Sequence, residues 1–257
     1  MIASLFADGL AQHINPGDSL LASLKIAKED TSKVHLLLSV SELFENTERE
    51  KAKDYINQAI ALSRKLEYPQ GLLKCYRRYA YIYSYQSRFD SALLYNRMTL
   101  DLARQQNDSF NIGAAYFNMG TAFRFLHDLD SALFYSLEAS RLLENKGYYH
   151  IESVLYDGLQ SLYMTLMQYE KAIQYGEKAV SISRNMNDRQ NLATALNNLG
   201  LNYLEVNRNA DAKKAYREGL ETAIQIGNKA LEAMLLNNLS EIAIREGNYD
   251  SILSYAN

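Results

Sequence analysis

The hydrophobic positions of this chain recur with a fixed period, which the residue numbers give directly. One ladder consists of tyrosines at equal intervals of forty, Tyr55, Tyr95, Tyr135 and Tyr175, with Tyr255 two intervals further on. A second ladder, three positions earlier in the same register, consists of Ala52, Ala92, Ala132, Ala172 and Ala212, with Ile252 in the last position. Two ladders in one register indicate an internal repeat.

Each repeat opens with another apolar set, which predicts a helix. Its positions are Leu36, Tyr76, Tyr116, Tyr156, Leu196 and Leu236, followed four positions later by Val40, Ala80, Gly120, Gln160, Gly200 and Ser240. Spacings of three, four and seven place such side chains on one helix face. The alanine and tyrosine ladders mark a second helix, and the mostly small residues mark where the two helices cross closely. We therefore expect one helical hairpin per repeat.

The register also sets the expected boundaries. Hairpins are predicted near residues 33–72, 73–112, 113–152, 153–192, 193–232 and 233–257, the last of them incomplete. Residues 1–32 are expected to form an N-terminal segment with an amphipathic capping helix over residues 18–28. Asp90, Asp130 and Asp250 lie where a first-turn acid or cap stabilises a following helix, whereas segments 106–108, 187–188 and 226–228 read as helix stops.

The motif Leu196-Asn-Asn-Leu-Gly-Leu-Asn-Tyr203, followed by Ala212, resembles the tetratricopeptide pattern W-x2-L-G-x2-Y…A. The resemblance covers about residues 33–257. The chain departs from that family in its longer period, since the common repeat has roughly 34 residues. It also has no tryptophan, no proline that closes the unit, and Gln160 at a small-residue position. The longer period is similar to the variant found in peptide-sensing bacterial regulators and in cargo or polarity adaptors, in which the second helix is extended.

The resemblance implies an all-α protein, a right-handed α-solenoid superhelix of about six hairpins. It also implies that the first helix of each hairpin lines a concave groove. The groove positions it assigns are Lys74, Arg77, Arg78, Tyr81, Tyr85, Asn118, Thr121, Arg124, Phe125, Asp157, Ser161, Asn197, Asn198, Asn237, Asn238 and Glu241. We expect a protein or peptide to bind along this line.

Two features of the predicted groove have alternative explanations. Asn118, Asn198 and Asn238 share one slot of the repeat. Their amides either bind the backbone of an extended peptide, since an amide is both donor and acceptor, or belong to an ordinary solvated helix face. Likewise, Arg77 and Arg78 either anchor an acidic group of a ligand or pair with acids on neighbouring helices.

Composition narrows the function classes. With 27 Lys and Arg against 30 Asp and Glu, the net charge of −3 gives no electrostatic reason to bind nucleic acid. The single cysteine, Cys75, excludes an intrachain disulfide, and the four histidines show no metal-ligand spacing. The sequence has no phosphate-binding glycine loop, no nucleophile elbow and no apolar run long enough to span a membrane. We therefore expect no enzyme activity, no cofactor and no metal.

The function that these features favour is a non-catalytic binding scaffold, the sensor or interaction module of a bacterial signalling or regulatory protein. The segment after Asp18 resembles the start of arrays attached to sensor kinases and helix-turn-helix regulators of Bacteroidetes-type bacteria, which would place the array in the periplasm. Residues 1–12 read either as the tail of a secretory signal or as an ordinary start. The alternative function is structural assembly, by docking a partner subunit or by homo-oligomerisation through an exposed C-terminal end.

Overall fold

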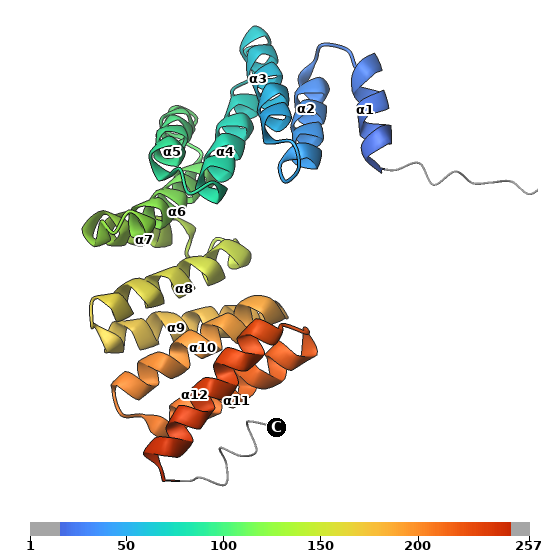
Figure 1. Ribbon diagram of the computed structural model, residues 1–257. Helices are drawn as coiled ribbons and strands as arrows, with labels where there is room; N and C mark the ends of the chain where they lie inside the picture. Colours follow the sequence, from blue (N-terminus) through green and yellow to red (C-terminus); the bar gives the residue numbers. More distant parts are fainter. Residues whose placement is uncertain (1–15, 248–257) are drawn as a thin grey trace, which may run out of the picture. The chain divides into compact units, whose positions relative to one another are not determined.

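The computed structural model of the chain describes residues 16–247, in which every regular element is an α-helix (Figure 1). The helices are α1 (Pro16–Ile26), α2 (Thr31–Phe44), α3 (Arg49–Lys65), α4 (Pro69–Tyr85), α5 (Phe89–Gln105), α6 (Ser109–Phe125), α7 (Leu129–Leu143), α8 (Tyr149–Thr165), α9 (Tyr169–Asn185), α10 (Arg189–Glu205), α11 (Asn209–Gln225) and α12 (Lys229–Arg245). The all-α class is confirmed. The predictions for residues 1–12, for Asp250 and for the ladder positions 252 and 255 lie outside the described residues.

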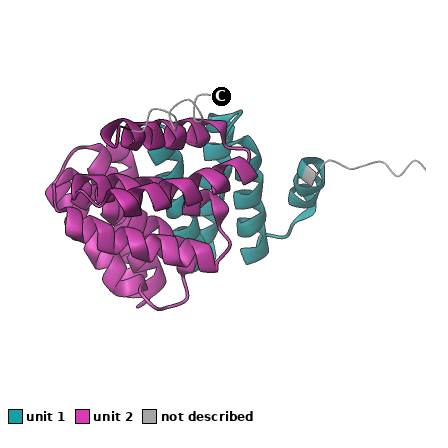
Figure 2. Ribbon diagram, turned by 90° about the horizontal axis from the view of Figure 1, so that it is seen from below, with its two compact units in different colours: residues 1–86 teal, residues 87–257 magenta. Residues whose placement is uncertain are grey.

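The chain divides into two compact units, residues 1–86 and residues 87–257 (Figure 2). The first unit holds α1 to α4, and α1, which begins and ends two residues before the expected helix over residues 18–28, packs against α2. Within the described residues the second unit holds α5 to α12, with the hairpins α6/α7, α8/α9 and α10/α11. Each unit is described by itself below.

Each period of the repeat consists of two equal halves, with one helix in each half. From α4 to α12 the helices begin at positions 69, 89, 109, 129, 149, 169, 189, 209 and 229. Each of them has 17 residues except α7, which has 15. The two helices of a hairpin are therefore nearly equal in length.

Left-handed residues close most of the helices. Examples are Met167, with φ of 56°, and Gly227, with φ of 70°. A left-handed residue at this place lets the last carbonyls of the helix find donors. One such bond joins the amide of Asp188 to the carbonyl of Ser183 at 2.9 Å. The chain can thus turn sharply into the next helix without leaving these carbonyls unpaired.

The segments expected to stop a helix follow the ends of α5, α9 and α11, and the last residue of each segment also starts the next helix. The side chains of Asp108, Asp188 and Asn228 accept bonds of 3.0–3.1 Å from the third backbone amide that follows. An oxygen at this position satisfies a helix N–H that has no partner within the helix. Asp90 and Asp130 lie in the first turns of α5 and α7, as the sequence predicts.

The two helices of a hairpin approach closely because a glycine on one helix faces a side chain of the other helix at the crossing. A Cβ added to Gly120 would lie 2.5 Å from the Ser136 hydroxyl, and one added to Gly200 would lie 2.3 Å from the Tyr216 ring. In α8/α9 the sizes are reversed. Gln160 occupies the small-residue slot of α8, and Gly176 on α9 gives it room, since a Cβ there would lie 2.6 Å from its amide. This exchange accounts for the departure of Gln160 from the repeat pattern.

The same substitution in two places tests this packing rule. Gly200→Ala should lower the free energy of unfolding by about 1–3 kcal/mol, because the new methyl group overlaps a fully buried tyrosine ring. Gly158→Ala should raise it by about 0.5–1 kcal/mol, because an added Cβ there meets no atom within 4 Å and alanine favours the helix. Urea denaturation measures both. Equal effects of the two substitutions would contradict the rule.

Candidate ligand-binding face

The first helices of successive hairpins form a continuous row in the second unit. Helix α6 contacts α8, α8 contacts α10, and α10 contacts α12 (Figure 1). Among the described residues, the second helices α9 and α11 meet through side chains, as in the ion pair of 2.7 Å between Arg184 and Glu218. First helices that approach more closely than second helices lie on the inner side of a stack. We call the surface formed by α6, α8, α10 and α12 the inner face.

A chain of hydrogen bonds crosses the inner face and joins three helices. The amide nitrogen Nδ2 of Asn238 on α12 donates to Oδ1 of Asn197 on α10 at 2.9 Å. Nδ2 of Asn197 donates to Oδ1 of Asn198 at 3.4 Å, and Nδ2 of Asn198 donates to Oδ1 of Asp157 on α8 at 2.9 Å. We call these four residues the amide chain. It brings together four of the positions that the sequence assigns to the groove.

Asp157 is the ionisable end of the amide chain. Burial raises the pKa of its carboxyl group above the usual value of an aspartate, while the hydrogen bond from Asn198 and the charge of Arg124 partly offset that rise. Arg124 comes from the neighbouring first helix α6. A half-buried carboxylate kept beside amides and one cation is an arrangement more typical of functional sites than of a stable core.

The slot shared by Asn118, Asn198 and Asn238 does not form an unbroken row of amides. Gly158 occupies it on α8, and an added Cβ there would meet no atom within 4 Å. The inner face therefore has an open place between Asn118 on α6 and Asn198 on α10. Asn118 is half-buried, and Asn237, next to the shared slot, is exposed.

The remaining predicted positions of the second unit lie on α6, α8 and α12. Arg124 lies over the ring of Phe125, 4.8 Å from its centroid, and Phe125, 51% exposed, stacks on Phe89 at 4.9 Å. Thr121 donates to a carbonyl of its own helix, and Ser161 is half-buried. Glu241 accepts a bond of 2.6 Å from Arg245 on the same helix. Arg124 thus places a positive charge near Asp157, and Phe125 offers an exposed ring on the same helix.

The predicted positions in the first unit lie along α4. Arg78 forms ion pairs with Glu42 and, at 3.1 Å, with Glu45, so it pairs with acids of a neighbouring helix. The exposed Lys74 lies 3.3 Å from Nδ1 of His35. Tyr81 and Tyr85 stack with their centroids 6.5 Å apart and are more than half exposed. Arg77 is half-buried.

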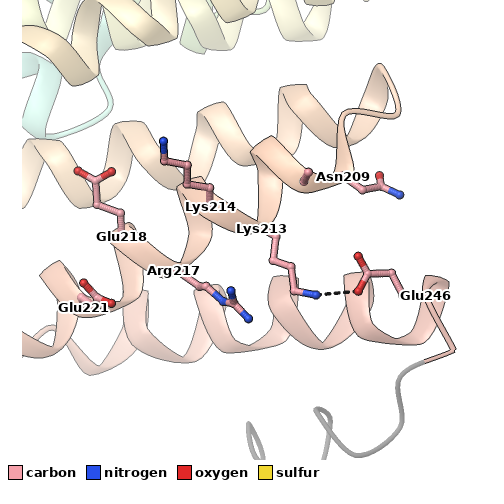
Figure 3. Close-up of a pocket in the computed structure, with 8 residues that line it drawn as sticks. Asn209, Lys213, Lys214, Arg217, Glu218, Glu221 and Glu246 are labelled. Carbon is pink, nitrogen blue, oxygen red and sulfur yellow. Dashed lines mark hydrogen bonds and ion pairs between the residues drawn. The ribbon is translucent and has the colours of Figure 1, made fainter.

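A hollow of about 660 Å³ lies elsewhere, on α11 and the end of α12 (Figure 3). Its lining residues are Asn209, Ala210, Lys213, Lys214, Arg217, Glu218, Glu221 and Glu246. The hollow is lined by charges of both signs, and Lys213 is paired with Glu246 at 2.7 Å. None of the predicted groove residues lines this hollow. Sequence reasoning did not find it, because its residues read as an ordinary charged helix surface.

The single cysteine, possible metal ligands and possible membrane-spanning helices remain to be considered. Cys75 is fully buried, and burial raises the pKa of its thiol to about 12, so it is protonated and unreactive at neutral pH. In residues 16–247 no three His, Cys, Asp or Glu side chains are grouped so that they could hold a metal ion. Within that range, too, no helix combines the length and the apolar character needed to cross a membrane.

The raised pKa of Asp157 gives a pH dependence with a definite sign. A group that binds its proton more tightly when folded contributes stability at low pH and loses that contribution as pH rises through its folded pKa. Asp157→Asn removes this titration. The variant should therefore gain stability relative to the wild type as pH is raised from 3.8, the ordinary Asp value, through the folded pKa to neutrality. Urea unfolding between pH 3.5 and about 7 measures this difference.

The exposed Asp101 on α5 offers the matched control, because Asp101→Asn removes the same charge outside the inner face. It should show no such trend. A stability difference for Asp157→Asn that is constant with pH would contradict the assignment of a raised pKa.

Comparison with known proteins identifies the repeat. Residues 153–225 match the model of a tetratricopeptide repeat family, and these residues include α9, α10 and α11. A comparison with curated proteins finds no match in sequence.

Solved structures resemble the whole fold. A signal transduction ATPase with numerous domains from Pyrococcus horikoshii, which has a tetratricopeptide repeat sensor, is 19% identical with a TM-score of 0.78, covering 91% of this chain and 36% of its own. This chain thus spans about a third of that protein. BtubC from P. vanneervenii is 19% identical with a TM-score of 0.74, covering 82% of this chain and 91% of its own.

A third structure, a Rap protein complexed with Competence and Sporulation Factor, is 19% identical with a TM-score of 0.62. The similarity covers 90% of this chain and 69% of the Rap protein. Identities of this size show the fold alone. Residues 153–225 are similar to tetratricopeptide repeats, and the described chain has the fold of a tetratricopeptide-like array of helical hairpins.

Proposed function

We propose that this chain is the non-catalytic protein- or peptide-binding module of a bacterial signalling or regulatory protein, and that an extended peptide binds along the inner face of the second unit. The observation that carries the proposal is the amide chain, which places three asparagine amides and one carboxylate in a line across α8, α10 and α12. A peptide backbone offers donors and acceptors in such a line.

The surroundings of the amide chain supply the other contacts that a peptide needs. The open place at Gly158 leaves room for backbone or a side chain of the ligand. Arg124 can pair with an acidic side chain or a terminal carboxylate, and the exposed ring of Phe125 offers apolar contact. Burial raises the pKa of Asp157, so ionisation of this carboxyl group costs stability, which favours a role in binding over a role in the core.

The structural comparisons support this proposal at the level of protein class. One of the similar structures has a tetratricopeptide repeat sensor, and another holds Competence and Sporulation Factor in a complex. The predicted positions on α4 belong to the first unit, and we propose them as a binding surface of that unit by itself. Among them, Lys74, Tyr81 and Tyr85 present charge and aromatic rings to solvent.

A direct test compares two double variants against a pooled library of short synthetic peptides. Asn118→Ala/Arg124→Ala removes an amide and a cation from the inner face, and within residues 16–247 neither side chain makes a hydrogen bond to another helix. This variant should lose at least about tenfold in affinity by calorimetry, corresponding to one or two polar contacts, while its melting temperature stays close to that of the wild type.

The control variant, Lys214→Ala/Arg217→Ala, removes two exposed cations from the hollow on α11. It should bind like the wild type. Equal losses in both variants would mean that the inner face is not the binding site. Absence of binding by the wild type itself would show that free peptides are not its ligands.

A further inference from the structure

One second helix of the array, α7, has two apolar residues at the centre of its solvent-facing side. Four of its residues, spaced by four, three and four positions, lie along one side of the helix: Asp130, Phe134, Leu137 and Arg141. Phe134 is 57% exposed, Leu137 is half-buried, and the two charged residues are exposed. We call these four residues the outer stripe of α7. Its centre is apolar, and its two ends carry opposite charges.

The repeat itself does not require an apolar centre at this place. The residues at the same four positions are Asp90, Leu94, Arg97 and Asp101 in α5, Glu170, Gln174, Glu177 and Ser181 in α9, and Ala210, Lys214, Arg217 and Glu221 in α11. All of them are exposed, so this side of each second helix faces solvent. None of these three helices has apolar residues at both central positions. Adjacent apolar side chains on a solvent-facing side indicate a contact surface for a partner.

The outer stripe complements a reversed copy of itself. Positions 130 and 141 are equally far from its midpoint, and so are positions 134 and 137. When two copies of α7 lie antiparallel about this midpoint, Asp130 faces the partner's Arg141, and Phe134 faces the partner's Leu137. A two-fold axis repeats each contact, which gives two ion pairs and two apolar contacts. A parallel arrangement would instead place like charges opposite each other at both ends, which is unfavourable.

We propose that the outer stripe of α7 binds a second copy of this chain, and that the two copies pair antiparallel through the same stripe. Charge complementarity selects this partner, because the stripe has one acid and one base at matching distances from its centre. The proposal goes beyond peptide binding and does not depend on it, because the inner face is formed by α6, α8, α10 and α12. In such a dimer both inner faces lie outside the contact.

Both ends of the outer stripe are available for contacts with a partner. Within residues 16–247, Asp130 takes part in no ion pair. Arg141 donates through one nitrogen to Glu138 on the same helix at 2.9 Å. A guanidinium has five N–H donors, so the bond to Glu138 leaves others for the partner's Asp130. A contact through one helix of each chain buries less than about 1,200 Å², so the dimer should be weak and exchange with the monomer.

Sedimentation equilibrium measures the pairing. From about 5 µM to about 1 mM protein, the average mass of the wild type should rise from 29.3 kDa towards twice this value, with half of the chains paired near about 0.1 mM. Phe134→Gln introduces the residue type that α9 has at this position. It should weaken pairing at least about tenfold, because each dimer loses two buried rings, and it should keep the melting temperature of the wild type.

Met234→Gln is the matched control, because it replaces another apolar residue of similar exposure, 53%, on the inner face. It should pair like the wild type. A wild type that stays monomeric over the whole concentration range would overturn the proposal, and so would equal losses in both variants. A loss confined to Met234→Gln would also overturn it, because the contact would then lie on α12.

The orientation is tested by disulfide cross-linking. Cys75 is fully buried and does not interfere. Mild oxidation of an equimolar mixture of Asp130→Cys and Arg141→Cys proteins should give mixed dimers beyond the statistical share, because positions 130 and 141 lie opposite each other in the antiparallel pair. A mixture in which mixed dimers only reach the statistical share, or in which identical variants are mainly joined, would contradict the antiparallel arrangement.

Discussion

Close contact between the two helices of each hairpin is the constraint on which this structure depends. In two of the hairpins a large side chain meets a glycine at the crossing, as Tyr216 meets Gly200 and Gln160 meets Gly176. The two members of a pair can exchange sizes, because the space between the helices and not the identity of either residue is what the fold requires. Hairpins held in this way are uniform enough to stack one after another.

Stacking places equivalent positions of successive first helices side by side, and this produces the candidate site. The two bonds of the amide chain that cross between helices join Asp157 to Asn198 and Asn197 to Asn238, and both pairs are 41 residues apart. Residues whose sequence separation is one greater than the repeat period therefore lie close enough to form hydrogen bonds between successive first helices. Arg124 adds a positive charge near Asp157, and Gly158 leaves space where other repeats have an asparagine. The chemical groups on the inner face therefore differ from repeat to repeat, as recognition of a particular ligand requires.

The sequence predicts the helical hairpins, because burial of the alanine ladder and of the small residues at the helix crossing leaves a strict pattern. Ala132 and Ala172 are fully buried, as that pattern demands. The first helices α4, α6 and α8 begin at residues 69, 109 and 149, which is earlier than the predicted hairpin starts near 73, 113 and 153. The sequence pattern does not show that successive helices begin at equal intervals, because the two helices of a hairpin bury different sets of residues. The sequence does not distinguish helix-starting caps such as Asp188 from helix stops, because asparagine and aspartate favour both the end of one helix and the start of the next.

The site is predicted only in part. The sequence assigns Asp157, Asn197, Asn198 and Asn238 to one surface, but whether their amides meet a ligand or each other depends on the stagger between helices, which a single sequence does not contain. The pairing of Arg78 with Glu42 and Glu45 depends in the same way on neighbouring helices. Polar side chains separated by one position more than the repeat period are the one signal that could have indicated the bonds in advance.

The central claim is that the inner face of the second unit is where a ligand binds. The most direct measurement is a map of side-chain amide resonances in asparagine-labelled protein during titration with a peptide that binds. The account predicts the largest shifts at Asn118, Asn198 and Asn238, with the exposed Asn107 and Asn185 unchanged. Shifts concentrated at Asn209, beside the hollow on α11, would contradict it and place the binding site on the opposite helices of the hairpins.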